Sequence, residues 1–193
     1  MSCTIDFTGL NDILYNCDLD FSGGLKAIRL MERAEYQSAV DAGEIEVNST
    51  SGEYDFVSGV TALAAITGID VIALNFNNKD GFSNLTDVKT VNADGSASVV
   101  PTIQVEFARM SAGLRNTLES IAKGGAEMVA IVETAAGTVH AVGTEFGLYA
   151  SSVDGASGAS RTDKNRFQLT LTGEENSLAY GVSSALWTAI KAL

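Results

Sequence analysis

The chain is poor in the residues from which most enzyme sites are built. Its 193 residues include one histidine, His140, and two cysteines, Cys3 and Cys17. No G-x-S-x-G elbow and no complete phosphate-binding glycine loop is present, and the two cysteines have neither the number nor the spacing of a disulfide framework. His140 lies within a short strand-like segment, where a surface or hydrogen-bonded imidazole is the ordinary interpretation. We therefore expect no enzyme, no catalytic residue and no cofactor.

Positive charge and long apolar runs are scarce as well. The chain has 12 Lys plus Arg against 24 Asp plus Glu, a net charge of −12. A protein that grips nucleic acid needs clustered cations to neutralise phosphates, so specific DNA binding is not expected. The longest apolar run, residues 60–74, is interrupted by Thr61, Thr67, Gly68 and Asp70 and is too short for a membrane helix. The first residues lack a basic and an apolar signal region, which predicts synthesis in a cytoplasm and no membrane partner.

Calcium is the main chemical alternative, because Asp, Asn and Gly turns offer oxygen ligands. Asp18, Asp20 and Gly23 match the opening of an EF-hand loop, but the twelfth position is Arg29 where a bidentate glutamate is needed. We therefore expect turns and no metal site. The acidic residues Asp41, Glu44 and Glu46 are most simply a solvated surface.

What the chain has is typical of a sheet protein. It contains 19 glycines, one proline and many Ser, Thr and Val residues. We predict an α+β fold, mainly β, in which a β-sandwich or barrel is flanked by one α-helix at residues 111–123. Residues 1–24 are predicted to form an N-terminal arm and residues 25–193 a single domain.

The predicted helix has Ser111 as its cap, apolar residues at 114, 118 and 121, and two glycines at its end. The strands are expected near 25–31, 44–47, 53–58, 69–76, 87–91, 102–107, 128–132, 138–142, 146–150 and 167–172. Residues 32–43 are predicted to be a polar connection with at most one helical turn. Turns are expected at 77–81, 92–95 and 135–137.

Apolar and polar residues alternate strictly in the strands predicted at 102–107 and 167–172, so one face of each strand must contact water. Residues 151–166, between two strands, are almost without apolar side chains and are predicted to be a long loop, either mobile in solvent or ordered on a partner subunit. Strands of this kind leave exposed edges unless a neighbour covers them, which favours a protein that assembles with copies of itself.

The order of elements between Val99 and Glu175 resembles the tail-tube proteins of tailed bacteriophages, which are related to the tubes of contractile injection systems. The resemblance rests on the strand 102–107, the helix 111–123, the hairpin 128–142 with Gly137 at its turn, the segment 143–148, the Ser/Gly-rich loop, and the Leu-Thr-Gly-Glu-Glu sequence that ends at Glu175.

The resemblance implies a virion protein whose hexameric rings stack into a tube, with hairpins joined between subunits into a continuous barrel. Its partners would be copies of itself, other tail proteins, and DNA that slides through a negatively charged channel without adhering. The residues expected on the channel or another wet face are Gln104, Glu106, Gln168 and Thr170. The residues expected to make contacts between rings are Asp154, Arg161, Asp163, Lys164 and Arg166. The alternative is another virion or secreted structural module, such as a capsid decoration protein or an adhesin domain.

Overall fold

The computed structural model describes residues 23–48, 52–56, 71–74, 83–108, 110–123, 125–160, 163 and 165–192. Most of the predicted arm, and the turn expected at 77–81, therefore lie outside the described residues. The elements in chain order are β1 Leu25–Glu32, α1 Arg33–Asp41, β2 Ile45–Val47, β3 Tyr54–Phe56, β4 Ile72–Leu74, β5 Asn84–Val91, β6 Ala97–Ala108, α2 Ala112–Lys123, β7 Met128–Thr134, β8 Val139–Val142, β9 Leu148–Ala156, β10 Arg166–Gly173, β11 Tyr180–Gly181 and α3 Ser184–Ala192.

Nine of the strands form one antiparallel sheet, and β2 and β3 form a separate hairpin. Within the large sheet, β9-β10-β6-β5 is one row and β11-β8-β7-β1-β4 is the other. A single pair of residues, Met128 and Leu148, joins the two rows. The prediction of a mainly β, α+β fold is confirmed. The sheet is open, because its two rows end in unclosed strands in the described part of the chain, so a closed barrel is not formed within one copy.

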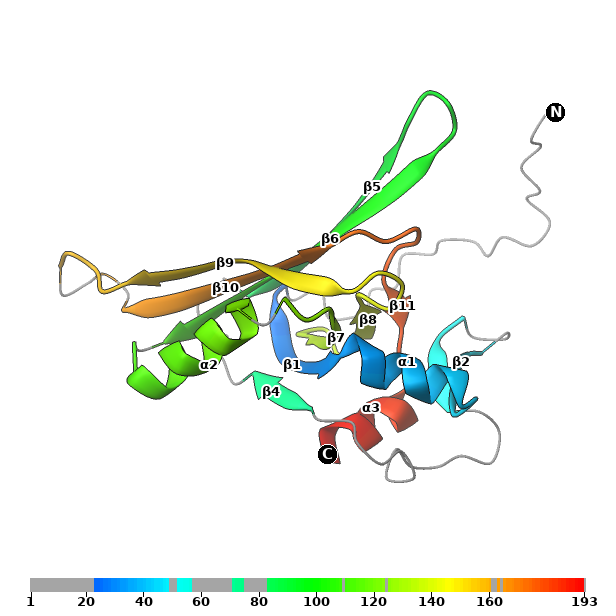
Figure 1. Cartoon of the computed structure of the whole chain (residues 1–193), viewed down its shortest axis with the longest axis horizontal. Helices are drawn as coiled ribbons and strands as arrows, with labels where there is room; N and C mark the ends of the chain where they lie inside the picture. Colours follow the sequence, from blue (N-terminus) through cyan, green and yellow to red (C-terminus); the bar gives the residue numbers. More distant parts are fainter. Residues whose placement is uncertain are drawn as a thin grey trace.

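Two apolar clusters hold this arrangement together. The first lies between the two rows and combines Ile28, Leu30 and Val132 with Ile103, Leu169 and Leu171, which is why the predicted alternation of 102–107 and 167–172 has one buried face. The second lies on the opposite face of β1 and β7, where α1 and α3 cover Val129 and Ile131. Figure 1 shows α1 and α3 together on that side of the sheet.

The helix predicted at 111–123 is confirmed as α2. The Ser111 hydroxyl accepts the Leu114 N–H at 3.3 Å, and Leu118 is fully buried in the first cluster. The prediction of a single helix is wrong. Residues 33–41 form α1, where one turn at most was expected, because Tyr36 and Ala39 bury against the sheet. Helix α3, near the C-terminus, was not predicted at all and buries Leu186, Trp187 and Ile190.

Two long hairpins extend from the body in different directions (Figure 1). One is β5–β6, closed by the predicted turn at 92–95, where the Gly95 N–H donates to the Asn92 carbonyl at 3.0 Å. The other is β9–β10. The predicted loop 151–166 is wrong for residues 151–156 and 166, because β9 extends to Ala156 and β10 begins at Arg166, with Asp154 opposite Gln168. Small polar residues such as Ser152 are tolerated there since they pair with the neighbouring strand β10, with Ser152 opposite Thr170.

Candidate assembly surfaces

The four residues expected on a wet face lie together on one face of the β9-β10-β6-β5 row. Gln104 is opposite Thr170, and Glu106 is opposite Gln168. The alternation of side chains across a strand extends this polar face to Asn84 on β5 and Asp154 on β9. Gln104, Gln168 and Thr170 are partly exposed. The pattern thus places these residues on one polar face.

Glu106 is the exception, and its expected exposure is wrong for the single copy. The residue is only 7% exposed, and its carboxylate forms an ion pair with the Arg166 guanidinium on the adjacent strand. The free-energy cost of removing a carboxylate from water is smaller when a cation lies beside it, so the Glu106 side chain can be buried within the sheet. The register places one further charge on this face, Asp154, so the polar face has little net charge.

The residues expected to make contacts between rings are divided between two strands and a short tip. Asp154 lies on β9, and Arg166 begins β10 and is occupied with Glu106. At the tip, the Asp163 carboxylate accepts the N–H groups of Ala159 at 2.8 Å and Ser160 at 2.7 Å, and these bonds hold the pKa of Asp163 below its ordinary value. Arg161 and Lys164 lie outside the described residues.

The outer half of the β5–β6 hairpin is the surface that the sequence did not reveal. Val88 is 52% exposed and Val91 is 67% exposed, and they point to opposite faces of the hairpin. The turn is well formed, because the Asp94 carboxylate accepts both the N–H and the hydroxyl of Ser96. The strand near 87–91 and its turn were predicted. Exposure on both faces depends on which other described segments pack nearby, and a local sequence pattern does not predict that. A two-stranded ribbon with both faces in water is marginal without further packing.

The outer edge of β5 also offers free backbone groups. The Asn92 N–H donates to the Ser96 carbonyl at 2.8 Å. Hydrogen-bonded pairs alternate in an antiparallel ladder, so Thr90 and Val88 also bond to β6, whereas Lys89 and Val91 direct their N–H and C=O groups outward. Pro101 stands opposite Asp87, at a position that needs no N–H, as this register requires. In the described part of the chain no strand pairs with this edge, and beyond Leu148 none pairs with the outer edge of β9 at the other end of the row.

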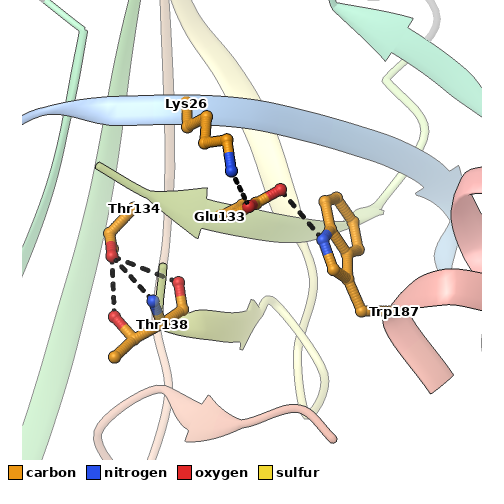
Figure 2. Close-up of polar contacts among 5 residues, drawn as sticks. All are labelled: Lys26, Glu133, Thr134, Thr138 and Trp187. Carbon is orange, nitrogen blue, oxygen red and sulfur yellow. Dashed lines mark hydrogen bonds and ion pairs between the residues drawn. The ribbon is translucent and has the colours of Figure 1, made fainter. Parts of the chain in front are cut away.

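A buried carboxylate fixes α3 to the sheet (Figure 2). Glu133 on β7 is 8% exposed and accepts hydrogen bonds from Lys26 Nζ at 2.6 Å and Trp187 Nε1 at 3.0 Å. Burial raises the pKa of Glu133, but the bonds from Lys26 and Trp187 outweigh burial, and the pKa lies below its ordinary value. Nearby, Thr134 and Thr138 close the β7–β8 turn through hydroxyl and backbone bonds. These contacts stabilise the fold by joining β1, β7 and α3.

Catalysis and metal binding depend on the geometry of the histidine and of the possible metal ligands among the described residues. His140 is half-buried with its Nε2 3.3 Å from the Thr138 hydroxyl, and burial lowers its pKa although Asp87 acts in the opposite direction. Among the described residues, no three His, Cys, Asp or Glu side chains are grouped as metal ligands would be. Within the same residues, no helix has both the length and the apolar character to cross a membrane.

Comparison with known proteins found no matching family, no curated relative and no similar solved structure.

Proposed function

We propose that this chain is a structural subunit that assembles with copies of itself into rings, and that the rings stack into a tube of the kind found in the tails of tailed bacteriophages. The observation that carries the proposal is the β5–β6 hairpin, which extends from the body with Val88 and Val91 in water and with an outer edge that no described strand covers. Exposed valines on a strand whose outer edge pairs with no described strand are an aggregation risk in a monomer, and a specific neighbour removes it.

The geometry of the row favours a ring. β5 and β9 are its two ends, and each step from β9 to β10, β6 and β5 reverses direction, so β5 and β9 run antiparallel. When copies are related by rotation about one axis, the β5 edge of one copy meets the β9 edge of the next in an antiparallel register. Such a head-to-tail contact closes into a ring or continues as a helix. Repeated around a ring, four strands from each copy would make the barrel that one copy lacks.

The polar face of the row would line the bore of that barrel. Thr, Gln and Ser side chains with few cations give DNA no clamp for its phosphates. The contacts of the tube with other tail proteins, its location in a virion and the hexameric count are expectations of the tail-tube resemblance.

A different structural role follows if the edge of β5 pairs with another protein. A capsid decoration protein or an adhesin domain would keep the same exposed hairpin but would not form polymers of its own. Self-assembly therefore separates the two proposals.

The test is the purified full chain in negative-stain electron microscopy and analytical ultracentrifugation. We expect rings or tubes above a threshold concentration. Val91→Pro removes an outward N–H of β5 without breaking a bond to β6, so this variant should remain folded and fail to assemble. Val91→Ile keeps the N–H, the apolar character and the β-branched shape and serves as the matched control, which should still assemble. A wild-type chain that stays a monodisperse monomer at high concentration would contradict the proposal.

A further inference from the structure

An apolar groove lies between β1, β4 and α2. It has a volume of about 250 Å³, and Ile72, Ile121 and Met128 contribute to its apolar lining. Ile72 is 44% exposed and lines the groove. The rim carries the exposed carboxylate of Glu32 at the end of β1. The groove therefore presents apolar surface beside a negative charge.

The underside of the β5–β6 hairpin has the complementary chemistry. Lys89 and Val91 are two residues apart on β5, so both point to the face on which Leu85 enters the core. Val91 is 67% exposed, and Lys89 is exposed and forms no ion pair with any described residue. One apolar side chain and one cation are thus presented side by side, about 7 Å apart along the strand.

The two surfaces lie where neighbouring copies would bring them together. Helix α2 packs against β9 and also supplies Ile121 to the groove, so the groove is on the β9 side of the molecule. The hairpin extends from the β5 side (Figure 1). If β5 of one copy continues the row of the next copy past β9, its underside faces the layer that contains α2, β1 and the groove.

We infer that the groove binds the hairpin of a second copy, with Val91 inserted among Ile72, Ile121 and Met128 and with Lys89 paired to Glu32. This inference rests on the proposed self-assembly and assigns the contact that selects the partner. Pairing of strand edges is sequence-independent, whereas a groove that requires an apolar residue and a lysine in one register specifies which strand is accepted.

A charge exchange tests the contact. Lys89→Glu places a carboxylate against Glu32, and Glu32→Lys places a cation against Lys89. Each single variant is expected to raise the concentration needed for assembly at least tenfold. The double variant Lys89→Glu/Glu32→Lys restores the opposite charges and should assemble within about threefold of the wild-type threshold. Sedimentation measures the threshold, and circular dichroism verifies that each subunit is folded.

The matched control is Lys89→Glu/Glu46→Lys. Glu46 is exposed on β2, beyond the far end of α1 from Glu32, so this variant has the same net charge as the rescued pair without the groove contact. It should remain as defective as Lys89→Glu alone. Equal rescue by Glu46→Lys would show that only net charge matters and would overturn the groove contact while leaving self-assembly intact.

A second measurement does not depend on charge. In a background with Cys3 and Cys17 replaced by serine, Val91→Cys/Ile72→Cys should form a ladder of covalent oligomers on mild oxidation, whereas Val91→Cys/Val47→Cys should not. If the wild-type chain forms tubes but Val91→Cys/Ile72→Cys gives no ladder, the groove contact alone is overturned. A wild-type chain that never assembles would overturn the proposed function and this inference together.

Discussion

Single buried carboxylates decide how parts of this molecule are joined. Glu133 connects β1, β7 and α3 through one side chain, and Glu106 ties β6 to β10 through Arg166. In both cases strand alternation alone gives no sign of burial, because the covering groups come from Trp187, 54 residues from Glu133, and from Arg166, 60 residues from Glu106. The sequence therefore predicted the face on which Glu106 lies but not that it is buried.

Replacing Glu133 should destabilise the subunit. Glu133→Leu leaves the buried Trp187 N–H without an acceptor and should reduce the free energy of unfolding by about 2 kcal/mol in urea denaturation. Glu133→Gln keeps an acceptor oxygen and should cost about half as much, since the partner Lys26 is 62% exposed and its attraction is screened by water. Glu119→Gln, in the exposed pairs of α2, is the control and should leave the urea midpoint unchanged.

The same variants have a pH signature. Because the pKa of Glu133 is lower in the folded chain than in the unfolded one, its ionised form adds stability above its ordinary pKa of 4.5, and this stability is lost as the pH falls through the folded value. The difference in unfolding free energy between wild type and Glu133→Gln should therefore be constant near neutral pH and shrink in acid. Burial raises the pKa of Glu175, so this residue changes the pH dependence of stability in the opposite direction. Subtracting the unfolding free energy of Glu133→Gln from that of the wild type removes the contribution of Glu175 and isolates that of Glu133. A difference that grows in acid would contradict the assignment.

At the scale of elements, the helices and strands that could be predicted are those with clear capping residues or apolar periodicity in their own sequence. Helix α2 has a cap, a regular apolar stripe and a terminal glycine pair, and the strict alternation of β6 and β10 marks their buried faces. Helices α1 and α3 have short stripes that become clear only against the face of β1 and β7 that they cover. The extent of β9 depends on pairing with β10, since its Ser- and Gly-rich outer half has weak strand propensity of its own.

The connection between β8 and β9 is fixed by glycines in close contact with the sheet. Gly143 has a φ of +83°, and a Cβ there would lie 2.6 Å from the Met128 carbonyl oxygen, a backbone atom that cannot move aside. Gly143→Ala should therefore lower the free energy of unfolding by about 3 kcal/mol through backbone strain and overpacking. Gly113→Ala, on α2 with open space around it, should raise it by about 0.5 kcal/mol. Thermal unfolding of both variants tests the contrast, and equal effects would contradict it.

For the whole molecule, the sequence predicted a mainly β fold and the polar face but not the open sheet or the number of helices. The open sheet results from how two rows of strands meet at Met128 and Leu148, a contact between residues with no local signature. The exposed hairpin and the groove are formed by different elements, and the contact that we propose between them would be made by two copies. Composition bears on the proposed assembly, because each chain has a net charge of −12.

Salt should therefore promote assembly. Like-charged copies repel over the Debye length, which falls from about 30 Å at 10 mM salt to about 8 Å at 150 mM. The same salt weakens the Lys89–Glu32 pair, but that single pair is set against a charge of −12 on every copy. The threshold concentration for assembly should fall severalfold between 10 and 150 mM NaCl, as measured by sedimentation, while sucrose at equal osmolality should have no comparable effect. A threshold that rises with salt would mean that contact ion pairs dominate over net repulsion, and Lys89→Glu/Glu32→Lys would then be expected to show the same rise because it preserves the pair.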